Sequence, residues 1–279
     1  MSASQEWLRT SMRSTHSMPP EVDRNAPSVS RAYDYALGGR NNFDVDRKAI
    51  DAIFEKFPGV RVLAVTHRSF LCRGVRYLVG EAGVRQLIDV GARLPNQETV
   101  HEIAHEIDPS VRVVYVDRDP VVLAHLQATL KDNDTVTTLQ AELADPSSIF
   151  DNPKIREFLD FDKPIGVLLT GSLHLLSDSQ DPVRVARLIK EAVPSGSYLL
   201  ICNLLNEGNN EVAARLQQEL VDRFGTGWFR TWEQQRPYFE GLELVEPGFV
   251  YANDWRPDED TPTDSEWRTF MCGGLGRKP

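Results

Sequence analysis

The sequence is poor in cysteine, in positive charge and in long apolar runs. Its three cysteines, Cys72, Cys202 and Cys272, stand far apart and form no C-x-x-C pair, which argues against a zinc knuckle or a disulfide framework and favours a reducing compartment. Lys and Arg number 31 against 41 Asp and Glu, a formal net charge of −10, which disfavours a broad nucleic-acid groove. The apolar runs, such as 198–205, are too short to span a membrane, and the polar N-terminus lacks the apolar core of a signal peptide. We therefore expect a cytoplasmic protein that binds neither nucleic acid nor membrane.

The chain has 279 residues, of which 41% are hydrophobic, enough for one large α/β domain with an appendage. Residues 1–27 are rich in Ser, Thr, Met and Pro without periodicity, and we expect a flexible tail. Residues 28–84 have helical spacing and predict a helical cap, with helices over 31–37, 42–57 and 60–81.

From residue 85 the pattern changes to short apolar strands that alternate with helices. This alternation predicts an α/β fold, a Rossmann-like domain over 85–279 with a parallel sheet covered on both faces. Two extended segments near the C-terminus add a closing pair, which makes the expected sheet seven-stranded and mostly parallel. The expected strands are 86–90, 112–117, 136–140, 165–170, 197–203, 242–251 and 267–275, and the expected helices are 96–107, 120–131, 147–160, 182–193, 209–224 and 230–240.

The first two of these strands end in a pattern typical of nucleotide-binding units. LIDVGARLP, residues 87–95, places Asp89 and Gly91 at the end of the first strand, and Asp117 ends the second. A glycine lets the backbone turn sharply and approach a ligand, and a carboxylate can accept hydrogen bonds from both ribose hydroxyls. Arg93 stands where such a turn is expected to have its second glycine.

The loop after the fourth strand is the next candidate, because ligands of open α/β sheets bind beyond the carboxyl ends of the strands. Thr170 and His174 lie in this region. His174 would position or deprotonate a substrate, or it would form a hydrogen bond within its own loop.

Several segments together resemble the actinobacterial S-adenosylmethionine-dependent methyltransferase family once known as a domain of unknown function. The resemblance runs from about residue 28 to 279 and includes the cap signature RAYDYALGGRNNFDVDR, YVDRDPVVLAH, AELADP and the ending GGLGRKP. It implies a class I methyltransferase fold that binds S-adenosylmethionine between cap and sheet and methylates a small molecule. The family reads D-x-G-[ST]-G at the glycine turn, and here Arg93 replaces the second glycine. Arg93 would fill the pocket, swing outward or pair with the ligand's carboxylate.

The resemblance also implies roles for single residues. Around the cofactor, one set would contact the methionyl end, another the ribose and adenine, and the cap would close over both. In that order the residues are Asp89, Gly91 and Ala92; Asp117, Arg118, Glu142 and Leu143; and Tyr33, Gly38, Gly39, Asn42 and Phe43. Thr170, after the fourth strand, would face the reacting methyl group.

Two other interpretations remain. The first is a non-catalytic descendant that acts as a binding or regulatory protein, in which Arg93 blocks or alters the cofactor pocket. The second is a zinc hydrolase, because His101, Glu102 and His105 match H-E-x-x-H. Against zinc, the buried stripe of that helix places the histidines on its flank, so we expect no metal.

Overall fold

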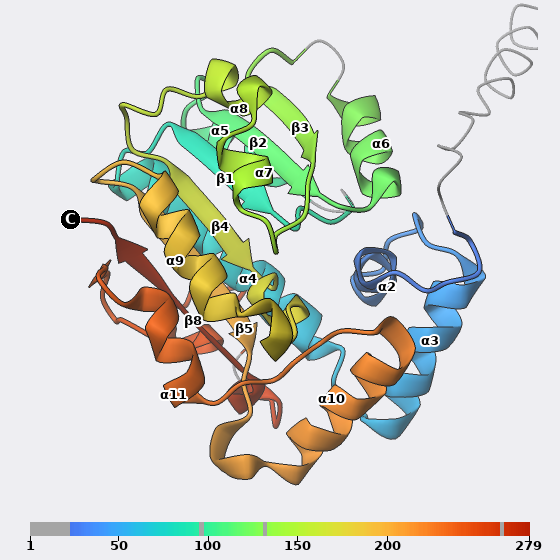
Figure 1. The fold of residues 1–279 in the computed structure, drawn as a ribbon. Helices are drawn as coiled ribbons and strands as arrows, with labels where there is room; N and C mark the ends of the chain where they lie inside the picture. The colour runs from blue at the N-terminus through green and yellow to red at the C-terminus, as the bar shows by residue number, and fades with distance from the viewer. Residues whose placement is uncertain (1–22, 95–97, 131–132, 263–264) are drawn as a thin grey trace, which may run out of the picture.

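The computed structural model describes residues 23–94, 98–130, 133–262 and 265–279. Residues 1–22, most of the expected tail, lie outside the described residues, as do residues 95–97 of the glycine turn. An eight-stranded sheet forms the centre, in the order β3-β2-β1-β4-β5-β8-β6, with β7 also paired to β8 (Figure 1). The strands are β1 Gln86–Val90, β2 Arg112–Asp117, β3 Val136–Gln140, β4 Gly166–Thr170, β5 Tyr198–Leu204, β6 Glu243–Leu244, β7 Val250–Tyr251 and β8 Met271–Arg277.

The first five strands are parallel and β8 runs antiparallel to β5. The five parallel strands lie within one residue of the predicted segments, and β1, β2, β4 and β5 are almost entirely buried, whereas β3 is buried at alternate positions only. β8 begins four residues after the start of the predicted segment 267–275 and ends two residues after its end. The expected strand 242–251 differs. It is divided into β6 and β7 around Pro247 and Gly248, since proline cannot donate to a strand ladder. The sheet therefore has eight strands instead of seven.

Helices cover both faces of the sheet. The alternation of side chains within β1 shows how: Leu87 belongs to the core on one face and Ile88 to the core on the other. α4, α5 and α6 contribute to the first core, and α7, α8 and α9 to the second. Their bounds are α4 Val62–Arg76, α5 Val100–Ile107, α6 Pro120–Thr129, α7 Ser147–Phe150, α8 Pro153–Phe158 and α9 Pro182–Ala192.

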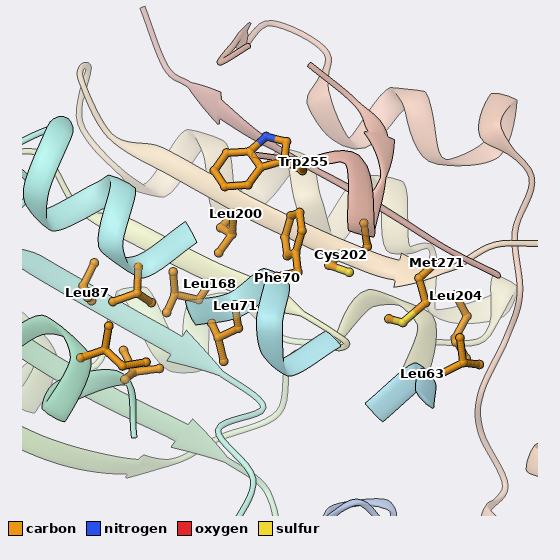
Figure 2. Packing of buried hydrophobic residues seen from close by; sticks show 14 of the residues in the cluster. Leu63, Phe70, Leu71, Leu87, Leu168, Leu200, Cys202, Leu204, Trp255 and Met271 are labelled. Atoms are coloured by element: carbon orange, nitrogen blue, oxygen red, sulfur yellow. The ribbon is translucent and has the colours of Figure 1, made fainter. Parts of the chain in front are cut away.

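α4 packs closely on the middle of the sheet. A Cβ at Gly74 would lie 2.2 Å from a methyl carbon of Leu200, so only glycine permits this approach. Phe70 of the same helix inserts between Trp255 and the β5 residues Leu200 and Cys202 (Figure 2). Buried Arg73 donates to the carbonyls of Ala252 and Trp255, which fastens the C-terminal loop to the helix.

Two further helices precede α4, and they gather with α10 at the end of the sheet to which the parallel strands point (Figure 1). These are α2 Val29–Ala36, α3 Asp44–Lys56 and α10 Glu211–Phe224. Arg31 ties α2 to the rest through Asp46 at 2.8 Å and Asp119 at 3.4 Å. The boundary of the cap at residue 84 stays a prediction. Among the described residues, no helix is long and apolar enough to cross a membrane.

Candidate functional site

The carboxyl ends of β1 and β4 form the centre of the candidate site. Strands β1, β2 and β3 follow one another towards one edge of the sheet, and β4 and β5 follow one another towards the other edge. The strand order therefore reverses between β1 and β4, and open α/β sheets bind ligands at such a switch point. Asp89 near the end of β1 and Thr170 at the end of β4 are 5% and 2% exposed. Gly91 turns the chain after β1 with a φ of +84°, and its N–H donates to Val116 of β2.

Arg93 crosses this switch point. Its backbone is left-handed, with a φ of +62°, and its side chain turns inward and is 9% exposed. Nη2 donates to the carbonyl oxygen of Gly171 at 2.7 Å, and Nη1 donates to that of Thr170 at 3.2 Å. Of the three positions considered for Arg93 from the sequence, the structure therefore has the one that fills the pocket.

The cap meets the same guanidinium from the other side. Arg93 lies over the ring of Tyr33 and its Nη1 contacts Nε2 of His67 at 3.3 Å. The Tyr33 hydroxyl bonds Nδ1 of His67 at 2.7 Å. Burial, and after it the charge of Arg93, holds the pKa of His67 well below its ordinary value, so that histidine is neutral at physiological pH.

Asp117 ends β2 beside this group and is 6% exposed. Its Oδ1 accepts the backbone N–H of Asp119 at 2.8 Å, and its Oδ2 accepts that of Arg93 at 3.1 Å. Burial raises the pKa of Asp117. Each carboxylate oxygen has a second lone pair, so the group keeps the capacity to accept from a diol. Asp119 caps α6 by accepting from Val121 at 2.9 Å.

Asp89 is the most perturbed carboxyl of the site. Burial raises its pKa to about 7, although Arg93 and Arg68 act in the opposite direction. It lines a cavity of about 40 Å³ together with Tyr33, Ala92 and Arg93.

A second, larger cavity lies between α2, α3, α4, α10 and the sheet. Its volume is about 150 Å³, and aliphatic and aromatic side chains make up most of its lining. His174 and His67 also line it. His174 is 9% exposed, and its Nδ1 is buried without a hydrogen-bond partner in the part of the chain that the structure describes. Burial, Arg93 and Arg230 lower the pKa of His174 to about 3, so the ring is neutral.

The other expected site residues lie outside both cavities. Gly39 packs against Asp34, whose carboxylate oxygen would lie 2.1 Å from a Cβ on that glycine. Asn42 donates to the same carboxylate at 2.7 Å, and the ring of Phe43 stacks under Arg31. Of the five cap residues expected at the cofactor, only Tyr33 lines either cavity. Gly38, Arg118 and Glu142 are exposed, and Leu143 is half-buried.

The H-E-x-x-H histidines of α5 are engaged in other contacts. A ring nitrogen of His101 bonds the Tyr115 hydroxyl at 2.8 Å, and Nε2 of His105 bonds the carbonyl of Val111 at 2.9 Å. Within 23–94, 98–130, 133–262 and 265–279 no three His, Cys, Asp or Glu side chains are grouped to hold a metal.

The family model described as S-adenosyl methyltransferase matches residues 15–279. The chain belongs to the S-adenosyl methyltransferase family. Two solved structures are similar over almost their whole length. A candidate methyltransferase from Thermobifida fusca YX is 39% identical, with a TM-score of 0.87 over 93% of this chain and 98% of that one. A DUF574 family protein from Streptomyces avermitilis MA-4680 is 34% identical, with a TM-score of 0.86 over 92% and 99%.

The likeness also reaches more distant methyltransferases. The N-methyltransferase NodS from Bradyrhizobium japonicum WM9, in complex with S-adenosyl-L-homocysteine, is 11% identical with a TM-score of 0.50, over 89% of this chain and 99% of NodS. At this identity the comparison shows a shared fold alone. Comparison with the curated proteins gives no match.

The S-adenosyl methyltransferase family takes its methyl group from S-adenosylmethionine, and the described residues fit one end of that molecule better than the other. If the nucleoside end lies at the end of β2, as the sequence predicts, Asp117 there retains acceptor capacity for it. At the methionyl end, the guanidinium of Arg93 packs so closely that its Nη2 would lie 2.3 Å from a Cβ on Gly171. If the charged tail of the cofactor lies at this turn, as the sequence predicts, it does not fit while Arg93 keeps this position.

Sequence reasoning missed the contribution of α10 to the larger cavity. Leu216, Leu220 and Phe224 lie on the apolar face of this helix and line the cavity. Their spacing indicated an amphipathic helix, but no signal in the sequence says which surface that face covers.

Proposed function

We propose that this chain methylates a small apolar molecule that binds in the 150 Å³ cavity between the cap, α10 and the sheet. When bound, S-adenosylmethionine supplies an electrophilic methyl group. The observation that carries the proposal is an apolar lining that includes the neutral rings of His67 and His174.

The size and chemistry of the cavity narrow the acceptor class. An apolar cavity of this volume holds a ligand about as large as one aromatic ring. A neutral imidazole would accept a hydrogen bond from a hydroxyl or amine on that ligand and hold it in line, or take its proton. The acceptor is therefore a single-ring or short-chain apolar compound with one hydroxyl or amino group.

The test is release of S-adenosylhomocysteine in the presence of S-adenosylmethionine and a panel of acceptors. Single-ring phenols and anilines should accelerate release, and hydroxy acids and nucleosides of similar size should not. Ala64→Leu extends a side chain into the cavity and should reduce turnover of the responsive acceptors. Val65→Leu, on the exposed side of the same helix at 42% exposure, is the control. A preference for the polar panel would refute the proposal.

The interpretation as a non-catalytic binding protein has one observation in its favour, the guanidinium of Arg93 at the methionyl end. The same assay separates the two functions. A protein that binds S-adenosylhomocysteine but releases none from S-adenosylmethionine, with any acceptor of either panel, would be a binding protein.

A further inference from the structure

The position of Arg93 bears on which ligands the cofactor site accepts. The backbone at Arg93 is left-handed, which is strained for a residue with a Cβ and ordinary for glycine. Four other residues then hold the side chain in place: Thr170 and Gly171 through their carbonyls, and Tyr33 and His67 through their rings. A strained backbone with a buried, fully engaged side chain indicates a defined role for this arginine.

The partners of the guanidinium are all uncharged. Carbonyl oxygens, a neutral histidine and an aromatic face surround it, and no carboxylate pairs with it in the described residues. Such a cage of neutral acceptors suits any organic cation, an ammonium included. A ligand's ammonium group would need these same acceptors at the switch point. The guanidinium of Arg93 already uses them.

The tail of S-adenosylmethionine has one ammonium and one carboxylate. The adenosine and sulfur that precede this tail do not need the carbonyls of Thr170 and Gly171 as acceptors. Bringing the ammonium beside Arg93 places two cations within a few ångströms in a buried region, which is unfavourable. The tail can enter only when the guanidinium leaves, and its departure also breaks the contacts with Tyr33 and His67 of the cap.

We propose that Arg93 occupies the position of the cofactor's tail and determines the selectivity of the site against that tail. This inference rests on the proposed function, because it requires that the chain binds S-adenosylmethionine, and it places the adenosine part beside Asp117. The wild-type protein then binds an adenosine thioether without a tail at least as tightly as one that has it. Removal of the guanidinium restores preference for the complete tail, since it frees the carbonyls of Thr170 and Gly171.

The experiment uses two unreactive ligands that share adenosine and a thioether sulfur. S-adenosylhomocysteine has the tail, and 5′-methylthioadenosine has a methyl group in its place. Isothermal titration measures both affinities for the wild type, Arg93→Gly and Arg93→Asn. Glycine and asparagine both adopt the left-handed backbone readily, so the turn should keep its shape. Circular dichroism spectra check that each variant folds.

Arg256→Gly is the matched control. Arg256 also has a left-handed backbone, with a φ of +47°, and its side chain pairs with Glu81 on the surface. The two changes therefore remove the same side chain from the same kind of backbone, once inside the site and once outside it.

The measured quantity is the ratio of the two affinities, S-adenosylhomocysteine over 5′-methylthioadenosine. We expect a ratio near or below one for the wild type and a rise of at least about tenfold in both Arg93 variants, with no more than about a threefold change in Arg256→Gly. A wild type that favours the tailed ligand by about tenfold, or a smaller rise in the Arg93 variants, would overturn the inference alone. Failure of every variant to bind either ligand would overturn the proposed function and this inference with it.

Discussion

The guanidinium carbon of Arg93 lies 4.6 Å from the centre of the Tyr33 ring. One residue follows the first strand of the sheet and the other belongs to the first helix of the cap. A buried cation–π contact therefore joins the two parts directly above the switch point.

This contact should be measurable as a coupling energy. In a double-mutant cycle of Arg93→Gly and Tyr33→Leu, followed by urea denaturation, we expect the free energies of unfolding to be coupled by about 1–2 kcal/mol. Arg256 and Tyr77 form the same type of pair at the same 4.6 Å, but the Arg256 side chain is 38% exposed. Their cycle should give a coupling of about 0.5 kcal/mol. Equal couplings in the two cycles would contradict the buried contact.

The raised pKa of Asp89 predicts a pH-dependent stability. Its folded pKa of about 7 lies above the unfolded value of 3.8, so the folded state binds a proton that the unfolded state lacks between these values. Stability from this group is fully present below the unfolded pKa and falls as the pH rises to about 7. Asn at this position does not titrate. Relative to wild type, Asp89→Asn should gain about 1–3 kcal/mol in free energy of unfolding between pH 4 and pH 8.

A half-buried carboxyl whose pKa is shifted in the opposite direction, Asp108, is the control for Asp89. Hydrogen bonds from Ser110 lower the pKa of Asp108, which also pairs with Arg85 at 2.6 Å. Its contribution is present above the unfolded pKa and disappears as the pH falls through the folded pKa. Asp108→Asn should therefore lose stability relative to wild type as the pH rises. Parallel pH profiles for the two variants would show that the assigned direction for Asp89 is wrong.

Asp117 should be needed for the adenosine part of the ligand. An amide has one acceptor oxygen, so Asp117→Asn cannot accept from both Arg93 and Asp119. We expect a loss of about 1–3 kcal/mol in stability and at least about a tenfold weaker affinity for 5′-methylthioadenosine by titration.

The matched variant for Asp117 is Asp119→Asn on the same turn. Asparagine caps helices as well as aspartate does, so α6 should keep its N-terminus. Affinity for 5′-methylthioadenosine should stay within about threefold of wild type. An equal loss in both variants would place the effect in the shape of the turn instead of in the carboxylate of Asp117.

The sequence predicted correctly those features that depend on a single strand or turn. Four of the five parallel strands, β1, β2, β4 and β5, followed from buried apolar runs, and the positions of Asp89 and Asp117 followed from where the first two of these runs end. The division of the segment 242–251 was missed because Pro247 and Gly248 interrupt pairing only in the context of β8. Local pattern cannot reveal which strand a short segment will join.

Directions of side chains were harder to predict than positions of residues. The sequence identified Arg93 as unusual but left three positions open for its guanidinium, because the acceptors at Thr170 and Gly171 are 77 and 78 residues away along the chain. For the double glycine of the cap as well, the sequence identified the position but not the group that lies beside it. It suggested a backbone that closes on a ligand, whereas Gly39 instead makes room for the carboxylate of Asp34.

His174 provides the last test, of how the acceptor is held. With a pKa of about 3, its ring stays neutral across the physiological range, so methyl transfer should show no protonation step of this residue between pH 6 and pH 9. His174→Gln should lower the rate of S-adenosylhomocysteine release by at least about tenfold with a responsive acceptor, because a glutamine amide does not hold the acceptor in the position that the imidazole sets. His105→Gln, outside both cavities, should leave the rate unchanged.

The lowered pKa of His174 also predicts how stability depends on pH. The unfolded state binds more protons than the folded state between pH 3 and 6.5, so the wild type loses stability as the pH falls through that window. His174→Gln should lose less over the same window in urea denaturation, and a variant that loses as much as wild type would show that the histidine is not held neutral by burial.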